Sequence, residues 1–198
     1  MKIDLNKVRK QVDLIDFRIL KLLNERMEFV LRIKRLKEEI ADPSREQVVL
    51  GNIQRHSQGL VSQRFAEKLF NEVISESKRI QGQNLKSIGF QGEHGAYGEV
   101  AALTFDNSMV PLPCREFTDV FEAVKSGQID FGIVPVENSL EGAVTEVSDL
   151  LVETGLKVIG EIKLPIHHAL LALPETDYRE IKAVYSHPQA LAQCRGFL

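Results

Sequence analysis

Apolar residues recur in alternating steps of three and four along the first 36 positions. Apart from one position, the members of this stripe are Leu5, Val8, Val12, Ile15, Ile19, Leu22, Phe29, Ile33 and Leu36. A repeat of this kind over more than four heptads predicts one long amphipathic helix whose stripe packs against another helix. The exception is Arg26, whose guanidinium stands where an apolar side chain belongs.

A buried, unpaired guanidinium costs on the order of several kcal/mol, so Arg26 needs an anionic partner. Two interpretations are open at this point. Arg26 either binds a small anionic ligand, or it pairs with an acid of a neighbouring helix or extends to the surface.

Helix geometry links Arg26 to a second cation. Lys37 lies 11 residues after Arg26. On a continuous helix its side chain would point within about 20° of the direction of Arg26, about 16 Å further along the axis, so the two side chains can hold a small dianion between them. Arg9 is about 25 Å away and turned by about 100°. Arg9 therefore reaches the same ligand only from another copy of the chain, although isolated Arg and Lys residues are usually just solvated.

Two shorter helices follow. Pro43 ends the first helix, and Ser44 with Gln47 forms a capping box that predicts a second helix, ending near Gly59. Ser62 is the expected cap of the third helix. The positions that we expect to be buried on these two helices are Val49, Leu50, Ile53, Phe65, Leu69, Phe70, Val73 and Ile74.

The buried face of the third helix continues into two polar side chains, Ser77 and Gln81, spaced i,i+4. Fraying at the end of a domain is the alternative explanation for this polar end. After residue 82 the pattern changes to short β-branched runs separated by glycines. We therefore predict a helical domain over residues 1–84 and a second domain over 85–198.

The second domain alternates strand-like and helix-like stretches, which predicts an α/β sheet. The strand-like runs are 87–90, 109–112, 131–137, 157–162, 168–173 and 183–186, and the amphipathic stretches are 117–126 and 144–154. A glycine-rich turn at 92–98 is a place where backbone N–H groups can receive an anion, although such glycines more often only form turns.

Polar residues near the end of the 131–137 run are a second candidate site. Asn138 and Ser139 follow Glu137 at the carboxyl edge of the predicted sheet, with a capped turn as the alternative. In the run around 168 we expect one of His167 and His168 to face the core and the other solvent. His187 is expected in a loop.

Composition narrows the classes of function. No apolar run approaches the ~20 residues of a membrane span, and the charged start has no signal-peptide pattern, which favours a cytoplasmic protein. Residues 1–84 carry 17 Lys and Arg against 12 Asp and Glu, while 85–198 carry 8 against 16. The basic excess of residues 1–84 is small and dispersed, which favours a small anionic ligand over nucleic acid.

Cys114 and Cys194 lack metal-ligand spacing, so we expect free thiols and no metal.

The polar residues of the helical part match one family in order: Arg9, Arg26, Lys37, Asp42, Arg45, Glu46, Ser77 and Gln81. This order resembles the AroQ-type chorismate mutase domain over about the first 81 residues. The resemblance implies a three-helix, intertwined homodimer that rearranges chorismate to prephenate without a cofactor. The implied catalytic residues are Lys37 and Gln81 at the ether oxygen, Arg26 at a carboxylate and Glu46 at the ring hydroxyl.

By the same resemblance, Arg9 of the partner binds the second carboxylate, and Asp42, Arg45 and Ser77 complete the pocket. The chemistry suits these residues, because a pericyclic rearrangement requires a compact substrate conformer and stabilisation of charge at the breaking C–O bond.

The stretches 89–102, 119–151 and 185–194 resemble prephenate dehydratase, which follows a mutase domain in the bifunctional P-protein family. The resemblance implies a periplasmic-binding-protein-like fold in which Asn138 and Ser139 line a prephenate cleft. The family's Thr-Arg-Phe motif and ACT domain have no counterpart before Leu198. We therefore expect an incomplete, inactive dehydratase portion over 85–198.

The sequence thus predicts a chorismate mutase of phenylalanine biosynthesis fused to a partial dehydratase. One alternative is a module that binds prephenate or another aromatic acid without dehydratase chemistry. Another is a helical dimerisation module with no chemistry, against which Arg26 argues, because a zipper would place an apolar residue or a single Asn at that position.

Overall fold

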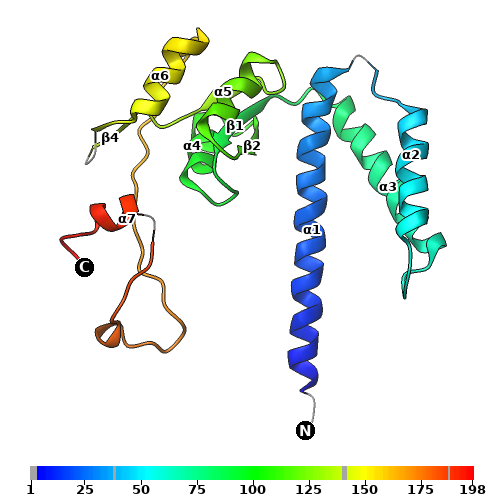
Figure 1. The fold of residues 1–198 in the computed structure, drawn as a ribbon, viewed down its shortest axis with the longest axis horizontal. Coiled ribbons are helices and arrows are strands. Elements are labelled where there is room, and N and C mark those ends of the chain that lie inside the picture. The colour runs from blue at the N-terminus through cyan, green and yellow to red at the C-terminus, as the bar shows by residue number, and fades with distance from the viewer. Residues whose placement is uncertain (1–3, 38, 140–141, 187) are drawn as a thin grey trace.

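The computed structural model describes residues 4–37, 39–139, 142–186 and 188–198. The first part is helical, with α1 at Leu5–Leu36, α2 at Pro43–His56 and α3 at Gln63–Gly82 (Figure 1). Helix α3 packs against both α1 and α2. The long helix and the third helix follow the predicted pattern. None of the described helices is long and apolar enough to cross a membrane.

The caps define where the helices begin. The Ser62 hydroxyl accepts a hydrogen bond from the Phe65 amide at 3.3 Å and caps α3, as predicted. The predicted capping box at Ser44 is wrong: Asp42 caps α2 by accepting a bond from the Arg45 amide at 2.9 Å. Pro43 explains the shift, because a proline at the first helical position has no amide to satisfy and its φ is already helical.

Burial in the helical part falls mainly on α3. Ala66, Val73, Ile74, Ser77 and Gln81 are buried there, and Val30 is buried on α1. Of the residues predicted to be buried, Val49, Leu50, Ile53 and Phe70 are partly buried, whereas Phe65 is 57% exposed and Leu69 42% exposed, contrary to the prediction. The stripe of α1 is also exposed at all nine of its apolar positions. The cause is geometric, because a single copy of the chain supplies no helix to cover these faces.

A three-stranded parallel sheet with the order β2-β1-β3 forms the centre of the second part. The strands are β1 at Ser87–Gln91, β2 at Val110–Cys114 and β3 at Phe131–Ile133, in the first three predicted runs. Helix α4 (Tyr97–Phe105) buries Ala102 in one core cluster and α5 (Phe117–Lys125) buries Val120 in the other. Gly132 lets α5 approach the sheet, since a Cβ there would lie 2.7 Å from Val120 Cγ1.

The chain then leaves the sheet. A hairpin of β4 (Glu137–Asn138) and β5 (Gly142–Ala143) leads into α6 (Thr145–Thr154). Helices α5 and α6 confirm the two predicted amphipathic stretches, 117–126 and 144–154. Residues 155–177 form no helix or strand, a 3₁₀ turn covers Tyr178–Glu180, and α7 covers Pro188–Gln193.

The predicted strands at 157–162, 168–173 and 183–186 are therefore wrong. An apolar run becomes a strand only when a neighbour completes its hydrogen-bond ladder, and the described chain offers these runs no such neighbour. The prediction that one of His167 and His168 faces the core is also wrong, because both are exposed. His187 lies outside the described residues.

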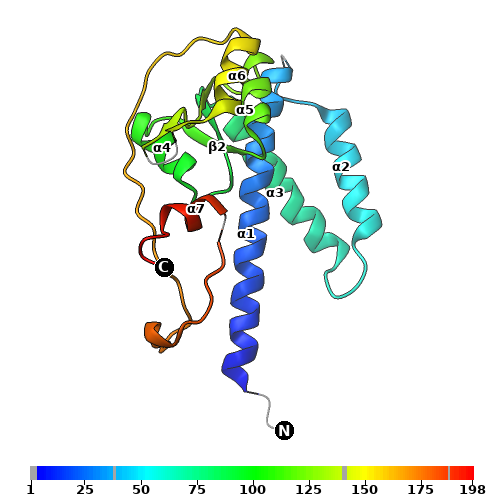
Figure 2. The same cartoon turned by 60° about the vertical axis from the view of Figure 1, so that its left-hand side comes forward.

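The two parts meet at the C-terminal end of α1, which both views place beside the sheet (Figures 1 and 2). Leu31 packs against the core cluster of Leu112 and Val120. Arg35 forms an ion pair with Asp130, which also accepts a bond from the Ser87 amide at 2.8 Å. Helix α1 thus belongs to the packing of both parts.

Candidate active site between the three helices

A cavity of about 240 Å³ lies between α1, α2 and α3. The polar residues that line it are Arg26, Lys37, Asp42, Arg45, Glu46, Ser77, Lys78 and Gln81. Seven of these eight were predicted from the sequence. Arg9 does not line the cavity, because it lies near the far end of the continuous helix α1. Apolar walls complete the cavity: Phe29, Val30, Ile33, Ile40, Val49 and Ile74.

Arg26 is partly buried and donates a hydrogen bond to the Ser77 hydroxyl, which itself donates to the Val73 carbonyl at 2.6 Å. Burial lowers the pKa of the Arg26 guanidinium from its usual value. Within the described ranges, no carboxylate forms an ion pair with Arg26. The alternative of an internal salt bridge is therefore wrong for the described residues, and a ligand of Arg26 stays a prediction.

Gln81 is only 5% exposed, and its side-chain amide donates to the Val30 carbonyl at 3.0 Å. This bond ties the end of α3 to α1 beside Arg26. Helix α3 continues to Gly82, so fraying does not explain the polar end of its buried face. The amide carries a second N–H that this bond leaves available for another acceptor.

Lys37 reaches the cavity by a different route from the predicted one. Helix α1 ends at Leu36, and Lys37 has an extended backbone with φ −138° and ψ 150°, so its position does not follow from helical rotation. Its ammonium donates to the Ile40 carbonyl at 2.8 Å. Lys37 and Arg26 nevertheless line the same cavity.

The start of α2 supplies the opposite wall. The Asp42 carboxylate accepts hydrogen bonds from the Arg45 amide and from the Ser44 hydroxyl at 2.7 Å, and these bonds lower the pKa of Asp42. Asp42 therefore caps the helix that carries Arg45 and Glu46. The Arg45 side chain is exposed at the rim.

Lys78 is the cavity residue that the sequence analysis missed. Its ammonium lies 3.1 Å from both carboxylate oxygens of Glu46, which joins α3 to α2 across the cavity. A signal was present, because Lys78 directly follows Ser77 and precedes Gln81 by three residues. The cavity then has four cationic and two anionic side chains, a net charge of +2 that matches a dianion.

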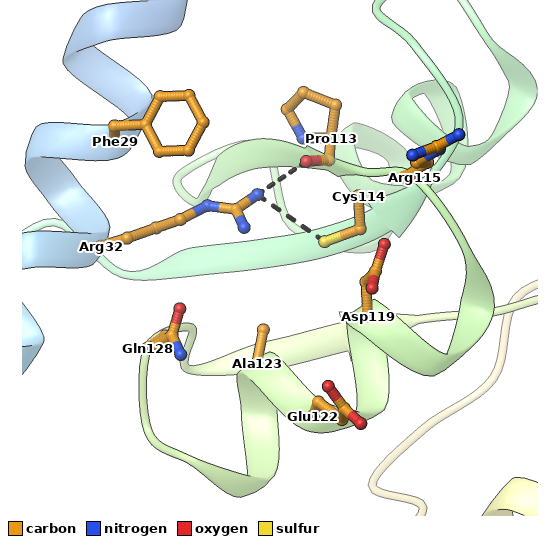
Figure 3. Close-up of a pocket in the computed structure, with 9 residues that line it drawn as sticks. All are labelled: Phe29, Arg32, Pro113, Cys114, Arg115, Asp119, Glu122, Ala123 and Gln128. Carbon is orange, nitrogen blue, oxygen red and sulfur yellow. Dashed lines mark hydrogen bonds between the residues drawn. The ribbon is translucent and has the colours of Figure 1, made fainter.

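A second cavity, of about 390 Å³, lies between α1 and the α/β part (Figure 3). Arg32 extends into it past Phe29 and donates to the Pro113 carbonyl at 2.6 Å, with Cys114 Sγ 3.7 Å away. Burial raises the pKa of the Cys114 thiol, and the nearby guanidinium opposes this shift. Arg115, Asp119 and Glu122 add both signs of charge to the wall, so this cavity has no preference for an anion.

The glycine-rich turn holds an anion of its own chain. The Gly95 amide donates to Glu99 Oε2 at 2.7 Å, so a carboxylate from α4 occupies the turn. Asn138 lies on β4, partly buried, and Ser139 is exposed in the turn that follows. Neither lines one of the two cavities described above. In the described part of the chain, no three acidic, His or Cys side chains are grouped to hold a metal ion.

Comparison with known proteins matches the two parts of the chain to two different families. Residues 8–82 match the chorismate mutase type II family, and residues 88–198 match the prephenate dehydratase family. Relatives named bifunctional chorismate mutase/prephenate dehydratase span both parts. The relative from Pseudomonas aeruginosa is 34% identical over 98% of this chain and 55% of its own length.

Two further relatives carry the same name. The one from Neisseria gonorrhoeae is 37% identical over 96% of this chain and 53% of its own length, and the one from Aquifex aeolicus is 35% identical over 98% and 56%. The chain thus spans about half the length of the curated relatives that it matches.

Proposed function

Since this chain belongs to the prephenate dehydratase family over residues 88–198 and carries a chorismate mutase type II domain over residues 8–82, we propose that its helical part converts chorismate to prephenate. The observation that carries this proposal is the cavity between the three helices. It combines apolar walls with a net charge of +2, which suits a small cyclic dianion.

The proposed roles follow from the chemistry of the rearrangement. Arg26 binds one carboxylate of chorismate and helps to select the compact conformer. Lys37 and Gln81 donate to the ether oxygen, where negative charge develops as the C–O bond breaks. Glu46 accepts a bond from the ring hydroxyl, while Asp42, Arg45 and Ser77 complete the wall. No step of this reaction requires a nucleophile or a redox group.

In this assignment Arg26 binds one carboxylate, Lys37 donates to the ether oxygen and Lys78 pairs with Glu46, so the second carboxylate needs a further cation. We propose that Arg9 of a second copy supplies it within a homodimer whose seam is the stripe of α1. Exposure of this stripe and of Phe65 and Leu69 supports the dimer, since large apolar surfaces are seldom left in water.

We propose a domain boundary after residue 84 and a partial prephenate site in residues 85–198, to which Asn138 and Ser139 contribute. The match over 88–198 supports this assignment. Binding of prephenate without dehydratase chemistry remains the alternative for this part. The cytoplasmic location and the exclusion of nucleic acid stay predictions.

The test is an activity assay on the 198-residue chain. Loss of the ultraviolet absorbance of chorismate, with prephenate as the product, is expected at a rate far above the spontaneous one. Residues 1–84 alone are expected to retain activity, because every lining residue lies at or before Gln81. An Arg26→Ala chain with unchanged helix content is the control. A folded wild-type chain that does not exceed the spontaneous rate would overturn the proposal.

A further inference from the structure

Two carboxylates, Asp42 and Glu46, line the cavity that we assign to chorismate, and their charge repels a dianion. Asp42 accepts bonds from the Arg45 amide and the Ser44 hydroxyl, whereas the charge of Glu46 opposes binding unless another group neutralises it. Lys78 lies where this neutralisation is needed, with its ammonium 3.1 Å from Oε1 and from Oε2 of Glu46.

We propose that Lys78 is a positioning residue of the mutase site. It acts through Glu46, whose charge it neutralises and whose carboxylate it holds in one orientation toward the substrate hydroxyl. This inference rests on the proposed function and adds a residue that determines how tightly the substrate binds.

The placement of the pair supports a role in the site rather than in general stability. Glu46 stands on the first turn of α2 and Lys78 on the last two turns of α3, and both line the cavity. The side chains are 31% and 40% exposed, so water screens their attraction only in part. Their charge still acts on a ligand that enters the cavity.

A second ion pair on the same helix provides a comparison. Arg79 pairs with Glu76 at i,i+3, and these side chains are 58% and 44% exposed. Neither lines the cavity. Exposed pairs of this kind contribute little to stability, so removal of Arg79 is a matched control for the loss of one cation from α3.

Both carboxylate oxygens of Glu46 accept a bond from Lys78, and each keeps lone pairs for a further donor. The substrate hydroxyl can therefore bind Glu46 while the ion pair persists. Lys78 then affects the substrate through Glu46, and its effect should depend on the charge at position 46.

A double-mutant cycle on the 198-residue chain tests this dependence. KM and kcat for chorismate are measured for the wild type, Lys78→Met, Glu46→Gln and the double variant, at low and high salt. Lys78→Met is expected to raise KM about tenfold at low salt and less at high salt, with a smaller change in kcat. In the Glu46→Gln background, the same change should alter KM less than about twofold.

Two variants complete the experiment. Lys78→Arg is expected to bring KM back to within about threefold of the wild type, and Arg79→Met to leave it within about twofold. Circular dichroism checks folding, and Lys78→Gln replaces Lys78→Met if the latter does not fold. A merely structural role for Lys78 would lower the melting temperature without a KM effect that depends on Glu46.

The proposal is overturned if Lys78→Met leaves KM unchanged, or if it raises KM by the same factor in both backgrounds, because Lys78 would then contact the substrate itself. Turnover of chorismate by the wild-type chain is measured first, because its absence refutes the proposed function. In that case the same cycle is run on the Kd for chorismate, measured by calorimetric titration. A wild-type chain that binds no chorismate refutes the inference as well.

Discussion

Single side chains of the helical cavity are already engaged in the free protein. The ammonium of Lys37 donates to the Ile40 carbonyl, and the amide of Gln81 donates to the Val30 carbonyl. These bonds hold both donors at the cavity wall before a ligand arrives. Donors that are held in place need little reorganisation when charge develops in a transition state, and this gives such groups their effect on rate.

Lys37→Ala is expected to lower kcat by a factor on the order of a hundred to a thousand, or about 3–4 kcal/mol, because its proposed bond strengthens in the transition state. Helix content and melting temperature should change little. Lys34→Ala is the matched control, since Lys34 binds the Gln83 carbonyl outside the cavity. A Lys37→Ala chain with wild-type kcat would exclude the proposed role.

Helix α1 is the element that connects the two parts of the chain. At 100° per residue, Val30 lies within about 40° of Arg26, whereas Glu28 and Arg35 lie about 160–180° away from it. One face therefore lines the helical cavity and the other contacts the α/β part. On the second face, the Glu28 carboxylate lies 2.8 Å from Nε2 of His94 in the glycine-rich turn. The Glu99 carboxylate lies 2.6 Å from the other ring nitrogen, Nδ1.

This contact predicts a pH dependence. Burial lowers the pKa of His94, but the bonds to Glu99 and Glu28 outweigh it, so the pKa lies above its usual 6.5. A histidine whose pKa is raised in the folded state stabilises the fold fully below its unfolded-state pKa of about 6.5. This stabilisation is lost as the pH rises through the folded-state pKa. The melting temperature of the wild type should therefore exceed that of His94→Gln by more at pH 6 than at pH 8.5.

The imidazole is 43% exposed, so the expected difference is small, about a few °C at most. Thermal unfolding followed by circular dichroism measures it. His56→Gln is the control, because His56 bonds within its own helix to the Asn52 carbonyl. A difference that stays constant between pH 6 and 8.5 would show that the charge of His94 does not stabilise the contact.

At the scale of the whole molecule, one copy of the chain leaves its first helix largely uncovered. The exposed stripe runs from Leu5 to Leu36, and the N-terminal half of α1 extends beyond the sheet and helices α4 to α6 in both views (Figures 1 and 2). Arg9 lies 17 residues before Arg26 on this helix, or about 25 Å. A symmetric antiparallel pair of such helices would bring each Arg9 to the other copy's cavity.

Complementation tests this arrangement. Arg9→Ala and Arg26→Ala chains are each expected to be inactive. After unfolding and refolding together, each mixed dimer should have one site with both defects and one intact site. Random pairing makes about half of the dimers mixed, so up to about a quarter of wild-type activity should return. If mixed dimers form and no activity returns, Arg9 does not act across an interface.

Much of this protein could be predicted from its sequence, because the signals are local. The three–four repeat predicts α1, Ser62 predicts the start of α3, and apolar runs predict β1 to β3. Seven residues of the cavity were predicted through a family resemblance, which rests on the order of polar residues along the chain. Local signals are sufficient wherever a residue's environment depends on its near neighbours in the chain.

Other features were decided only by tertiary structure, since they join residues far apart in sequence. The Lys78–Glu46 pair spans 32 positions and the Gln81–Val30 bond spans 51. The apolar run at 168–173 reads as a strand, yet it has no ladder partner and stays irregular. Pairing of this kind depends on which distant segment arrives beside a residue, and no periodicity within one segment contains that information.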